Sequence, residues 1–475
     1  MGFFNELFNF NRVAQRSQEF EELLAAGDID AIREQMTTRQ TLIIDALKDY
    51  DTFKHPINFR PDKQVTDAQK NRNGDAKTWK IPLPYPVYIN EIALVFLFGQ
   101  PVLWTQDSDN TDDAFKAFTD TLKRTRFNSK IRQCKRLAGA ETQSGMLFRV
   151  FKDKDGKPDV QIKVLAKTLG DDLYTRWDEY GNLLAVGWGH YIREDKKSVY
   201  HFDIYTHEKI YHCKQTRRWK VEEEDNEIGK IPIIVFEQEK EWAGVEPMMH
   251  RVEYMMSHSA DTNDYFADPI AVLNADMIKQ MPSKSEDGKT LIVKGHDNST
   301  NAASYLTWDS APESKKMELE NLEEKIHLFS FTPKISLDSL KAISQLSGKA
   351  LRTVMLLADI KAQKHKEVYD EMLDRTANII KAIIGNVLNV SLAKQAEELS
   401  VSHTFSEPFG EDVAATITNL STSLDSGIIS HETAVSLNPL VKDPTREMER
   451  IEEENEASFE QERQSAMMDL FEPTK

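Results

Sequence analysis

Two stretches decide the fold of this chain: GKIPIIVFEQEKEWAGVEPMMHRVEYMMSHSADTNDYFADP (Gly229–Pro269) and SGKALRTVMLLADIKAQKHKEVYDEMLDRTANIIKAIIG (Ser347–Gly385). Helix-type spacing of apolar residues dominates both stretches, and a polar insert punctuated by proline separates them. Neither stretch carries a recognisable catalytic constellation. They therefore indicate helices that pack against neighbours rather than an active site.

A single apolar stripe runs along the second stretch and just before it. Its members recur at multiples of three and four residues: Leu346, Ala350, Val354, Leu357, Tyr369, Met372, Ile380 and Ile383. This period predicts one helix from about Ser344 to Ile384, about 60 Å long at 1.5 Å per residue. A long core helix of any large α-rich protein has the same period. The preceding loop, SFTPKISLDSLKAISQL, favours a more specialised role.

Composition bounds the class of protein. A chain of 475 residues can bury a large core, and its length suggests roughly two to four domains. With two cysteines, Cys134 and Cys213, it has neither a disulfide framework nor a multi-cysteine zinc site, which fits a reducing, cytoplasmic setting. The longest apolar stretch, Val87–Phe98, is too short to span a bilayer and contains Glu91.

The net charge of −18 argues against general adhesion to nucleic acid, because neutralising phosphates requires clustered Lys and Arg. It does not exclude DNA passing nearby, since a wall that repels phosphate lets a duplex slide without sticking. One basic cluster stands out between Lys123 and Arg136, and its candidate contact residues are Arg124, Arg126, Lys130 and Arg132. Such a run is typical of a solvated helix face, of an intersubunit ion-pair surface, or of a polyanion site.

The patterning predicts an α+β fold that is mainly helical. Ser17–Asp51 has helical spacings around a break at Gly27, and a helix is expected from Val87 to Gly99 after a proline-rich extended segment. Asp112–Gly145 also has a helical pattern. From Met146 the period changes to two, which predicts antiparallel strands with tight turns as far as KIPIIVFEQ.

The C-terminal part combines short strand-like pieces with helices. TLIVKG and ASYLTW are β-like interruptions of the insert, and LSVSHTF is strand-like. The stretch EDVAATITNLSTSLDSGIISHETAVSLNPLV predicts two helices broken at Gly427 and Pro439, followed by an acidic tail from Asp443.

Candidate enzyme motifs fail on inspection. SKSEDGKT, residues 283–290, has Ser where a phosphate-binding loop needs its first Gly, and no buried strand precedes it. His250, His258 and Asp261 could form a metal-binding helix face, but no Glu-x-x-His pair accompanies them. No Gly-x-Ser-x-Gly elbow is present. The sequence therefore predicts no catalytic residue, no metal site and no cofactor.

The order of several short motifs resembles the portal proteins of tailed bacteriophages, in particular the siphophage-type family with the shorter subunit. The motifs are Gly99-Gln100-Pro101, the Ser/Asp/Asn-rich run Ser257–Asp264, Ser347-Gly348-Lys349-Ala350-Leu351, Gly427-Ile428-Ile429-Ser430-His431-Glu432-Thr433 and Leu437-Asn438-Pro439. Each motif is weak by itself, and their order carries the resemblance.

The resemblance implies a portal fold with named parts. The expected parts are a wing (1–244, with N-terminal helices 1–145 and a β-rich part 146–240), a first stem helix (245–268), a clip (269–312), a second stem helix (313–327), a tunnel loop (328–346), a long helix returning to the wing (347–398), and a crown with an acidic tail (399–475).

It also implies site residues and partners. The tunnel loop would present Lys334, Ser336, Lys341 and Ser344 to DNA, and the clip would use Lys279, Lys284, Lys289 and Trp308 against an adaptor or motor. The expected assembly is a ring of twelve copies of this chain at a capsid portal vertex. Expected partners are the terminase large subunit, a head-completion adaptor, the major capsid and scaffolding proteins, and double-stranded DNA bound without sequence specificity, with no membrane.

The expected location is the virion, and the host cytoplasm during assembly. Two alternatives remain open. A non-portal virion assembly scaffold would use the helices for oligomer contacts without a channel. A nucleic-acid-processing enzyme would need an acid cluster for two-metal chemistry, and the sequence shows none.

Overall fold

The computed structural model describes residues 20, 22–62, 78–194, 197–267, 270–274, 290–293, 303–306, 312–335, 355–406, 413–441, 444 and 446–454. The chain divides into two compact units, one of Met1–Ser336 with Met355–Ser406 and one of Leu337–Val354 with Glu407–Lys475. Helix and sheet are mixed, and 53% of the structure is helical, which confirms the α+β class.

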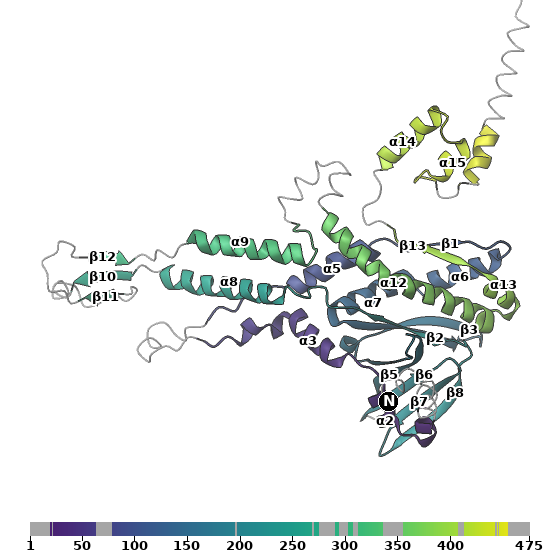
Figure 1. Cartoon of the computed structure of the whole chain (residues 1–475), viewed down its shortest axis with the longest axis horizontal. Helices are drawn as coiled ribbons and strands as arrows, with labels where there is room; N and C mark the ends of the chain where they lie inside the picture. Colours follow the sequence, from purple (N-terminus) through teal and green to yellow (C-terminus); the bar gives the residue numbers. More distant parts are fainter. Residues whose placement is uncertain are drawn as a thin grey trace, which may run out of the picture. The chain divides into compact units, whose positions relative to one another are not determined.

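Helices dominate the N-terminal part of the first unit (Figure 1). They are α2 (Ile29–Gln35), α3 (Gln40–Tyr50), α5 (Tyr85–Phe98), α6 (Asp112–Arg124) and α7 (Phe127–Glu141), with 3₁₀ turns at Thr52–Lys54 and Pro56–Phe59. The helical prediction for Ser17–Asp51 missed a second interruption between α2 and α3. There Thr37 pairs with Thr175 by two backbone hydrogen bonds of 2.8 and 3.0 Å, so tertiary pairing outweighs helical propensity.

The helix predicted from Val87 begins two residues earlier. Pro86 lies in the first turn of α5, where its missing N–H has no helical acceptor to lose. The helix ends at Gly99, as predicted. The single helix expected over Asp112–Gly145 is wrong, because Arg126 adopts a left-handed φ of 55° that separates α6 from α7.

Two antiparallel sheets follow. The first has the order β3-β2-β9 and consists of β2 (Gln143–Lys152), β3 (Pro158–Leu165) and β9 (Ile233–Glu237). The second has the order β4-β5-β6-β7-β8 and consists of β4 (Asp172–Trp177), β5 (Leu183–Glu194), β6 (Lys197–Tyr205), β7 (Lys209–Gln215) and β8 (Trp219–Asp225). The sheets confirm the period-two prediction, although β2 begins three residues before Met146. Gly156, between β2 and β3, and Gly181, between β4 and β5, provide the left-handed φ values, 78° and 81°, of two tight turns.

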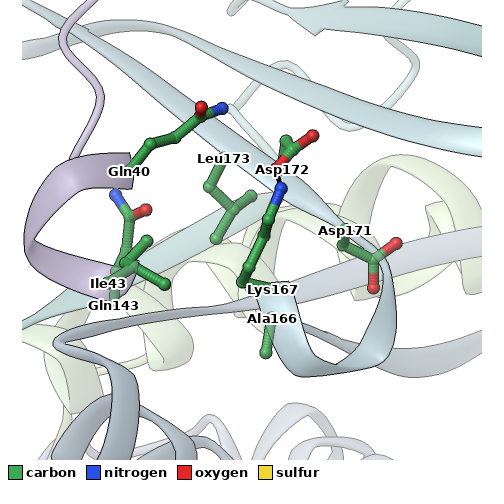
Figure 2. A pocket seen from close by; sticks show the side chains of 8 residues that line it. All are labelled: Gln40, Ile43, Gln143, Ala166, Lys167, Asp171, Asp172 and Leu173. Atoms are coloured by element: carbon green, nitrogen blue, oxygen red, sulfur yellow. Dashed lines mark hydrogen bonds and ion pairs between the residues drawn. The ribbon is translucent and has the colours of Figure 1, made fainter. Parts of the chain in front are cut away.

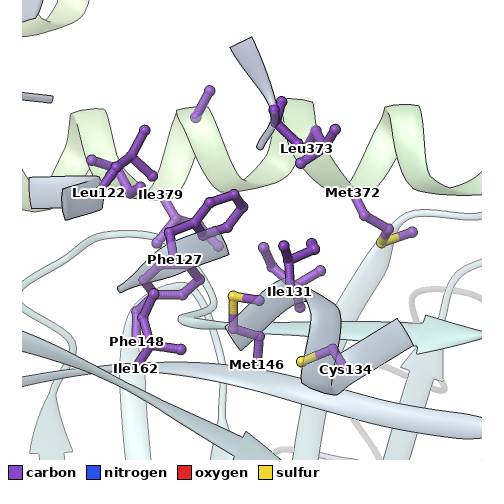
Figure 3. Close-up of a cluster of buried hydrophobic side chains, with 14 of the residues drawn as sticks. Leu122, Phe127, Ile131, Cys134, Met146, Phe148, Ile162, Met372, Leu373 and Ile379 are labelled. Atoms are coloured by element: carbon purple, nitrogen blue, oxygen red, sulfur yellow. The ribbon is translucent and has the colours of Figure 1, made fainter. Parts of the chain in front are cut away.

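The long helix α12 (Leu356–Ile383) covers the main core of the first unit. Figure 3 shows Met372 and Leu373 of α12 directed toward Ile131 of α7 and Met146 of β2. Tyr369, Met372, Ile380 and Ile383 are buried, which confirms that part of the predicted stripe. Its N-terminal part, residues 344–354, lies outside the described residues, and α12 begins directly after Met355.

Two helices that flank a small sheet form another part of the first unit. α8 (Glu246–Ala267) and α9 (Pro312–Phe329) lie side by side (Figure 1). They occupy nearly the ranges 245–268 and 313–327, whose assignment as stem helices stays a prediction. Between them in sequence come β10 (Ile270–Asn274), β11 (Thr290–Val293) and β12 (Ala303–Leu306), in the sheet order β11-β10-β12. The sequence pattern indicated β11 and β12 but not β10.

The described chain after α12 belongs partly to each unit. A π turn (Ile384–Leu388), a 3₁₀ turn (Val390–Leu392), α13 (Ala393–Glu398) and β13 (Val401–Thr404) complete the first unit. β13 pairs antiparallel with β1 (Leu103–Gln106), a strand that the sequence analysis missed. This pairing places residues 399–406 in the first unit, together with α12 and α13.

The described part of the second unit consists of α14 (Val413–Asp425), α15 (His431–Ser436) and a helical segment at 446–454. The predicted break between the first two helices occurs at Gly427, which has a φ of 66°.

Candidate functional site

An extended segment, Trp79–Leu83, lies along one face of α8; we call it the strap. Glu253 accepts the backbone N–H of Leu83 at 2.7 Å, and Ser257 accepts that of Ile81 at 3.0 Å. Asp261 accepts the N–H of Trp79 at 2.8 Å. Three acceptors spaced four residues apart on a helix thus bind three donors spaced two residues apart on an extended chain.

This match follows from two repeat lengths. Four helical residues rise about 6 Å, and two extended residues advance about 6.6 Å, so the two series stay in step over three contacts. Pro82 occupies one alternate position of the strap, Lys80 the other, and Pro84 directly follows Leu83. Because proline has no N–H, Pro82 and Pro84 cost the strap none of the donors that face α8.

Charged side chains close both ends of this contact. The Nδ1 atom of His55 lies 2.6 Å from Glu253 Oε1, and its Nε2 atom lies 2.6 Å from the carbonyl oxygen of Asp49. Near the other end Arg60 pairs with Asp261 at 2.9 Å. The side chains of Glu253, Ser257 and Asp261 are all at most 4% exposed. The strap and α8 therefore form one rigid element.

His250, His258 and Asp261, which the sequence analysis weighed as a metal-binding face and set aside, do not form a cluster on α8. Asp261 is engaged by Arg60 and the strap, and the ring of His250 lies against His55 with centroids 6.4 Å apart. Over the described ranges, no group of three or more His, Cys, Asp or Glu side chains is arranged to hold a metal ion.

A second buried polar cluster lies where α7, α12 and the end of β9 meet; we call it the Glu241 cluster. The Glu241 carboxylate contacts Lys135 of α7, Lys361 at 2.9 Å and His365 at 3.0 Å. Gln238 joins it, accepting from the Tyr369 hydroxyl at 2.8 Å and donating to Glu241 at 2.8 Å. Burial acts to raise the pKa of Glu241, but the positive charges of Lys135 and Lys361 outweigh it and hold that pKa well below its ordinary value.

The basic cluster predicted between Lys123 and Arg136 is divided by the fold. Arg132 donates to the carbonyl oxygens of Phe98 and Gly99 at 2.7 and 2.9 Å, so it caps the C-terminus of α5. Lys135 is fully buried. Arg124 pairs with Asp159 at 3.2 Å. Arg126 and Lys130 stay partly or fully exposed, so the candidate polyanion or intersubunit surface shrinks to these two and the half-exposed Arg124.

The predicted tunnel-loop residues are described only in part. Lys334 follows α9 and pairs with Glu323 of that helix at 2.6 Å. Ser336, Lys341 and Ser344 lie outside the described residues, as do the predicted clip residues Lys279, Lys284, Lys289 and Trp308.

One small pocket is lined by Gln40, Ile43, Gln143, Ala166, Lys167, Asp171, Asp172 and Leu173 (Figure 2). It has room for about one water molecule. Among the helices that the structure describes, none combines the length and apolar character needed to cross a bilayer.

Sequence reasoning missed the strap and the Glu241 cluster. The sequence did contain a signal for the strap. Glu253, Ser257 and Asp261 are polar residues four positions apart on an otherwise apolar helix face, and an upstream segment has prolines at alternate positions. The Glu241 cluster had none, since its members lie up to 230 positions apart (Lys135 to His365).

Comparisons with known proteins support the resemblance. The chain matches the family model "Phage portal protein, SPP1 Gp6-like" over residues 37–461. A search of curated proteins finds no match. Among 65 matching chains of solved structures, one from the "Neck of native GTA particle computed with C12 symmetry" is 10% identical, with a TM-score of 0.38, covering 75% of this chain and 90% of that chain. Because the family model spans most of the sequence, this chain belongs to the SPP1 Gp6-like family of phage portal proteins.

Proposed function

We propose that this chain is the subunit of a portal vertex, a homo-oligomeric ring at one corner of a phage capsid that conducts double-stranded DNA into and out of the head. Family membership over residues 37–461 is the observation that carries the proposal. Copies of the chain are the first partner, and the resemblance suggests twelve of them. The ring resides in the virion after assembly in the host cytoplasm, together with the major capsid and scaffolding proteins.

The described elements support a passive conduit. α8 and α9 form a rigid pair, tied by an Arg251–Glu318 ion pair at 2.8 Å and stiffened by the strap. They carry the small sheet β10–β12, in the range assigned to the clip. We infer that the pair is the stem, that this small sheet belongs to the docking face for the terminase motor and later the head-completion adaptor, and that an ATP-driven partner supplies the work.

The wing is the two-sheet body that α12 covers. We infer that DNA meets the segment after α9, which includes Lys334. In the structure Lys334 is half-exposed and paired with Glu323, so a passing phosphate competes with a single carboxylate for it. Such weak, exchangeable contact is what a sliding duplex requires.

Electrostatics shapes how the ring assembles. Each chain carries a net charge of −18, and copies placed side by side repel one another. Screening by salt reduces this repulsion over a Debye length of about 10 Å at 0.1 M ionic strength. We therefore expect assembly to strengthen as salt or divalent cation is added.

Electron microscopy of the purified full-length chain tests the proposal. Negative-stain images at 0.05 and 0.5 M NaCl, with light scattering on the same samples, should show rings with a central hole, more of them at high salt. A monomer or dimer under all conditions would overturn the portal assignment. A closed assembly without a channel would instead favour the non-portal scaffold.

A further inference from the structure

The chain leaves α9 through a tight, unusual turn. The N–H of Phe331 bonds to the carbonyl of Leu328 at 3.2 Å, and the N–H of Thr332 bonds to that of His327 at 2.9 Å. These two bonds form the Schellman pattern that ends many helices. Its left-handed position is usually glycine, yet here Phe331 adopts a φ of 52°. An aromatic residue keeps this conformation when the surrounding contacts determine it.

Lys361 of α12 supplies one such contact. Its ammonium group donates to the carbonyl of Ser330 at 3.1 Å and to the carbonyl of Glu241 at 2.8 Å. The same group lies 2.9 Å from the Glu241 carboxylate. Ser330 is one residue past α9, where backbone carbonyls lack helical partners and a cation is favourable. Lys361 therefore binds the helix end and the Glu241 cluster with one charge.

Tyr88 of α5 holds the same segment a little further on. Its hydroxyl donates to the carbonyl of Pro333 at 2.8 Å and accepts the N–H of Ile335 at 3.2 Å. The His327 ring, which contacts the Tyr88 ring with centroids 5.8 Å apart, also bonds to the carbonyl of Thr332 at 3.2 Å. Residues 330–335 are thus fixed from α12, α5 and α9.

The position of Lys361 is itself fixed. Its side chain is 10% exposed, and its Glu241 partner is 1% exposed and also bound by Lys135 and His365. The cluster joins α7, α12 and the chain after β9. A shift of α12 therefore moves the donor that holds the end of α9.

We propose that Lys361 is a positioning residue. It fixes the path that the chain takes from the end of α9 through Ser330–Ile335, and therefore the position of Lys334. Lys334 reaches Glu323, eleven positions earlier, because the turn at Phe331 folds the segment back against the helix. When the turn opens, Lys334 leaves Glu323 and becomes available to a polyanion. That last role for Lys334 rests on the proposed function, whereas the positioning by Lys361 does not.

Hydrogen exchange and lysine acylation of the full-length chain test this directly. Lys361→Met removes the three donors at nearly constant length. We expect amide exchange in residues 327–335 to rise at least tenfold, and Lys334 to react several-fold faster with N-hydroxysuccinimide acetate than in the wild type. Lys325, exposed on the same helix, is the internal reference, and peptides from β4–β8 should not change. Lys364→Met, an exposed lysine one turn further along α12, is the matched control and should leave both readouts unchanged.

Two further variants keep the test decisive. Phe331→Gly adopts the left-handed φ without steric cost, so in the Lys361→Met background it should restore most of the protection. Lys361→Gln retains amide donors without the charge and should give an intermediate effect if Lys361→Met does not fold. A uniform rise in exchange over the whole first unit, or unchanged exchange at 327–335 in folded Lys361→Met, overturns the proposal. Neither outcome bears on whether the chain forms rings.

Discussion

The Nδ1 atom of His55 lies 2.6 Å from Glu253 Oε1, in an interior where the two side chains are 3% and 1% exposed. The same carboxylate oxygen accepts the N–H of Leu83 from the strap. Glu253 thus joins α8 to two upstream segments at once. The other oxygen, Oε2, is buried and has no hydrogen-bond partner among the described residues. The His55–Glu253 contact therefore contributes to the attachment of α8, and the protonation state of His55 matters to stability.

The first prediction concerns pH. Burial by itself lowers the pKa of His55, but the hydrogen bond to Glu253 and the charge of that carboxylate outweigh it and raise the pKa above the ordinary value. A raised folded-state pKa gives stability that is fully present below about 6.5, the unfolded value, and is lost as pH rises through the folded value. We expect the difference in thermal midpoint between the wild type and His55→Gln to be largest at pH 6 and to shrink toward pH 9.

Glu253→Gln checks the cause, because it removes the charge that raises the pKa of His55. In Glu253→Gln the thermal midpoint should therefore vary less between pH 6 and pH 9 than it does in the wild type. His212, whose pKa is raised to about 9 by its hydrogen bond to Asp203, titrates with the same sign in the second sheet. It is present in all three proteins, so differences between them isolate His55. If the difference in thermal midpoint between the wild type and His55→Gln stays constant from pH 6 to pH 9, the assignment to His55 is contradicted.

The second prediction separates two lysines of α7 that look alike in the sequence. Burial lowers the pKa of Lys135, although the negative charge of Glu241 acts to raise it. Lys135→Met leaves Glu241 with one fewer cation in the interior, and breaking a buried pair costs about 3–5 kcal/mol of unfolding free energy. Lys130→Met, five residues earlier and partly exposed, should stay within about 0.5 kcal/mol of the wild type. Urea unfolding at one low protein concentration measures both. Equal effects of the two changes would mean that Lys135 is solvated rather than buried.

The third prediction concerns the strap. Ser257→Ala removes the acceptor of the partly buried Ile81 N–H, which costs at most about 1–3 kcal/mol. Ser259→Ala, two positions along α8 and on another face, is the matched control and should be near neutral. Hydrogen exchange at Ile81 should accelerate in Ser257→Ala alone. Unchanged exchange there would show that the strap does not depend on this bond.

The fourth prediction concerns the contact between α5 and α7. A Cβ atom added at Gly139 would lie 2.0 Å from Asn90 Oδ1 and 3.0 Å from Glu241 Cγ. Gly139→Ala should therefore destabilise the chain by about 1–3 kcal/mol, although alanine is the better helix former by about 1 kcal/mol. Adding Asn90→Ala removes the nearest atom and should recover part of the loss in urea unfolding. A more stable Gly139→Ala single variant would mean that propensity outweighs the clash.

Periodic elements were predictable from the sequence because their signal is local. Tyr369, Met372, Ile380 and Ile383 recur at helical spacing, and they are buried on α12 as expected. The period-two runs after Met146 became strands for the same reason. Element ends were less predictable: Arg126 in its left-handed conformation divides α6 from α7, and nothing in its neighbours announces that break.

Charge roles were not predictable, because they depend on which distant segments meet. Arg124, Arg126, Lys130, Arg132 and Lys135 form one run in the sequence. The fold turns Arg132 into a helix cap and Lys135 into a buried ion-pair partner, and leaves Arg126 and Lys130 to solvent. Helical rotation alone puts these residues on different faces, but only the packing of α5, β9 and α12 decides what each face meets.

The sequence by itself determined most of the helices and strands, the polar insert between the stretches Gly229–Pro269 and Ser347–Gly385, and, through the order of short motifs, the portal family. The tertiary structure decided that Glu253, Ser257 and Asp261 bind the strap, and that Lys361 holds the end of α9 to Glu241. The physical reason is the distance along the sequence over which each kind of interaction acts. Periodicity and turn chemistry act between residues close in sequence, whereas a buried charge is stable only where folding brings its partners from remote segments.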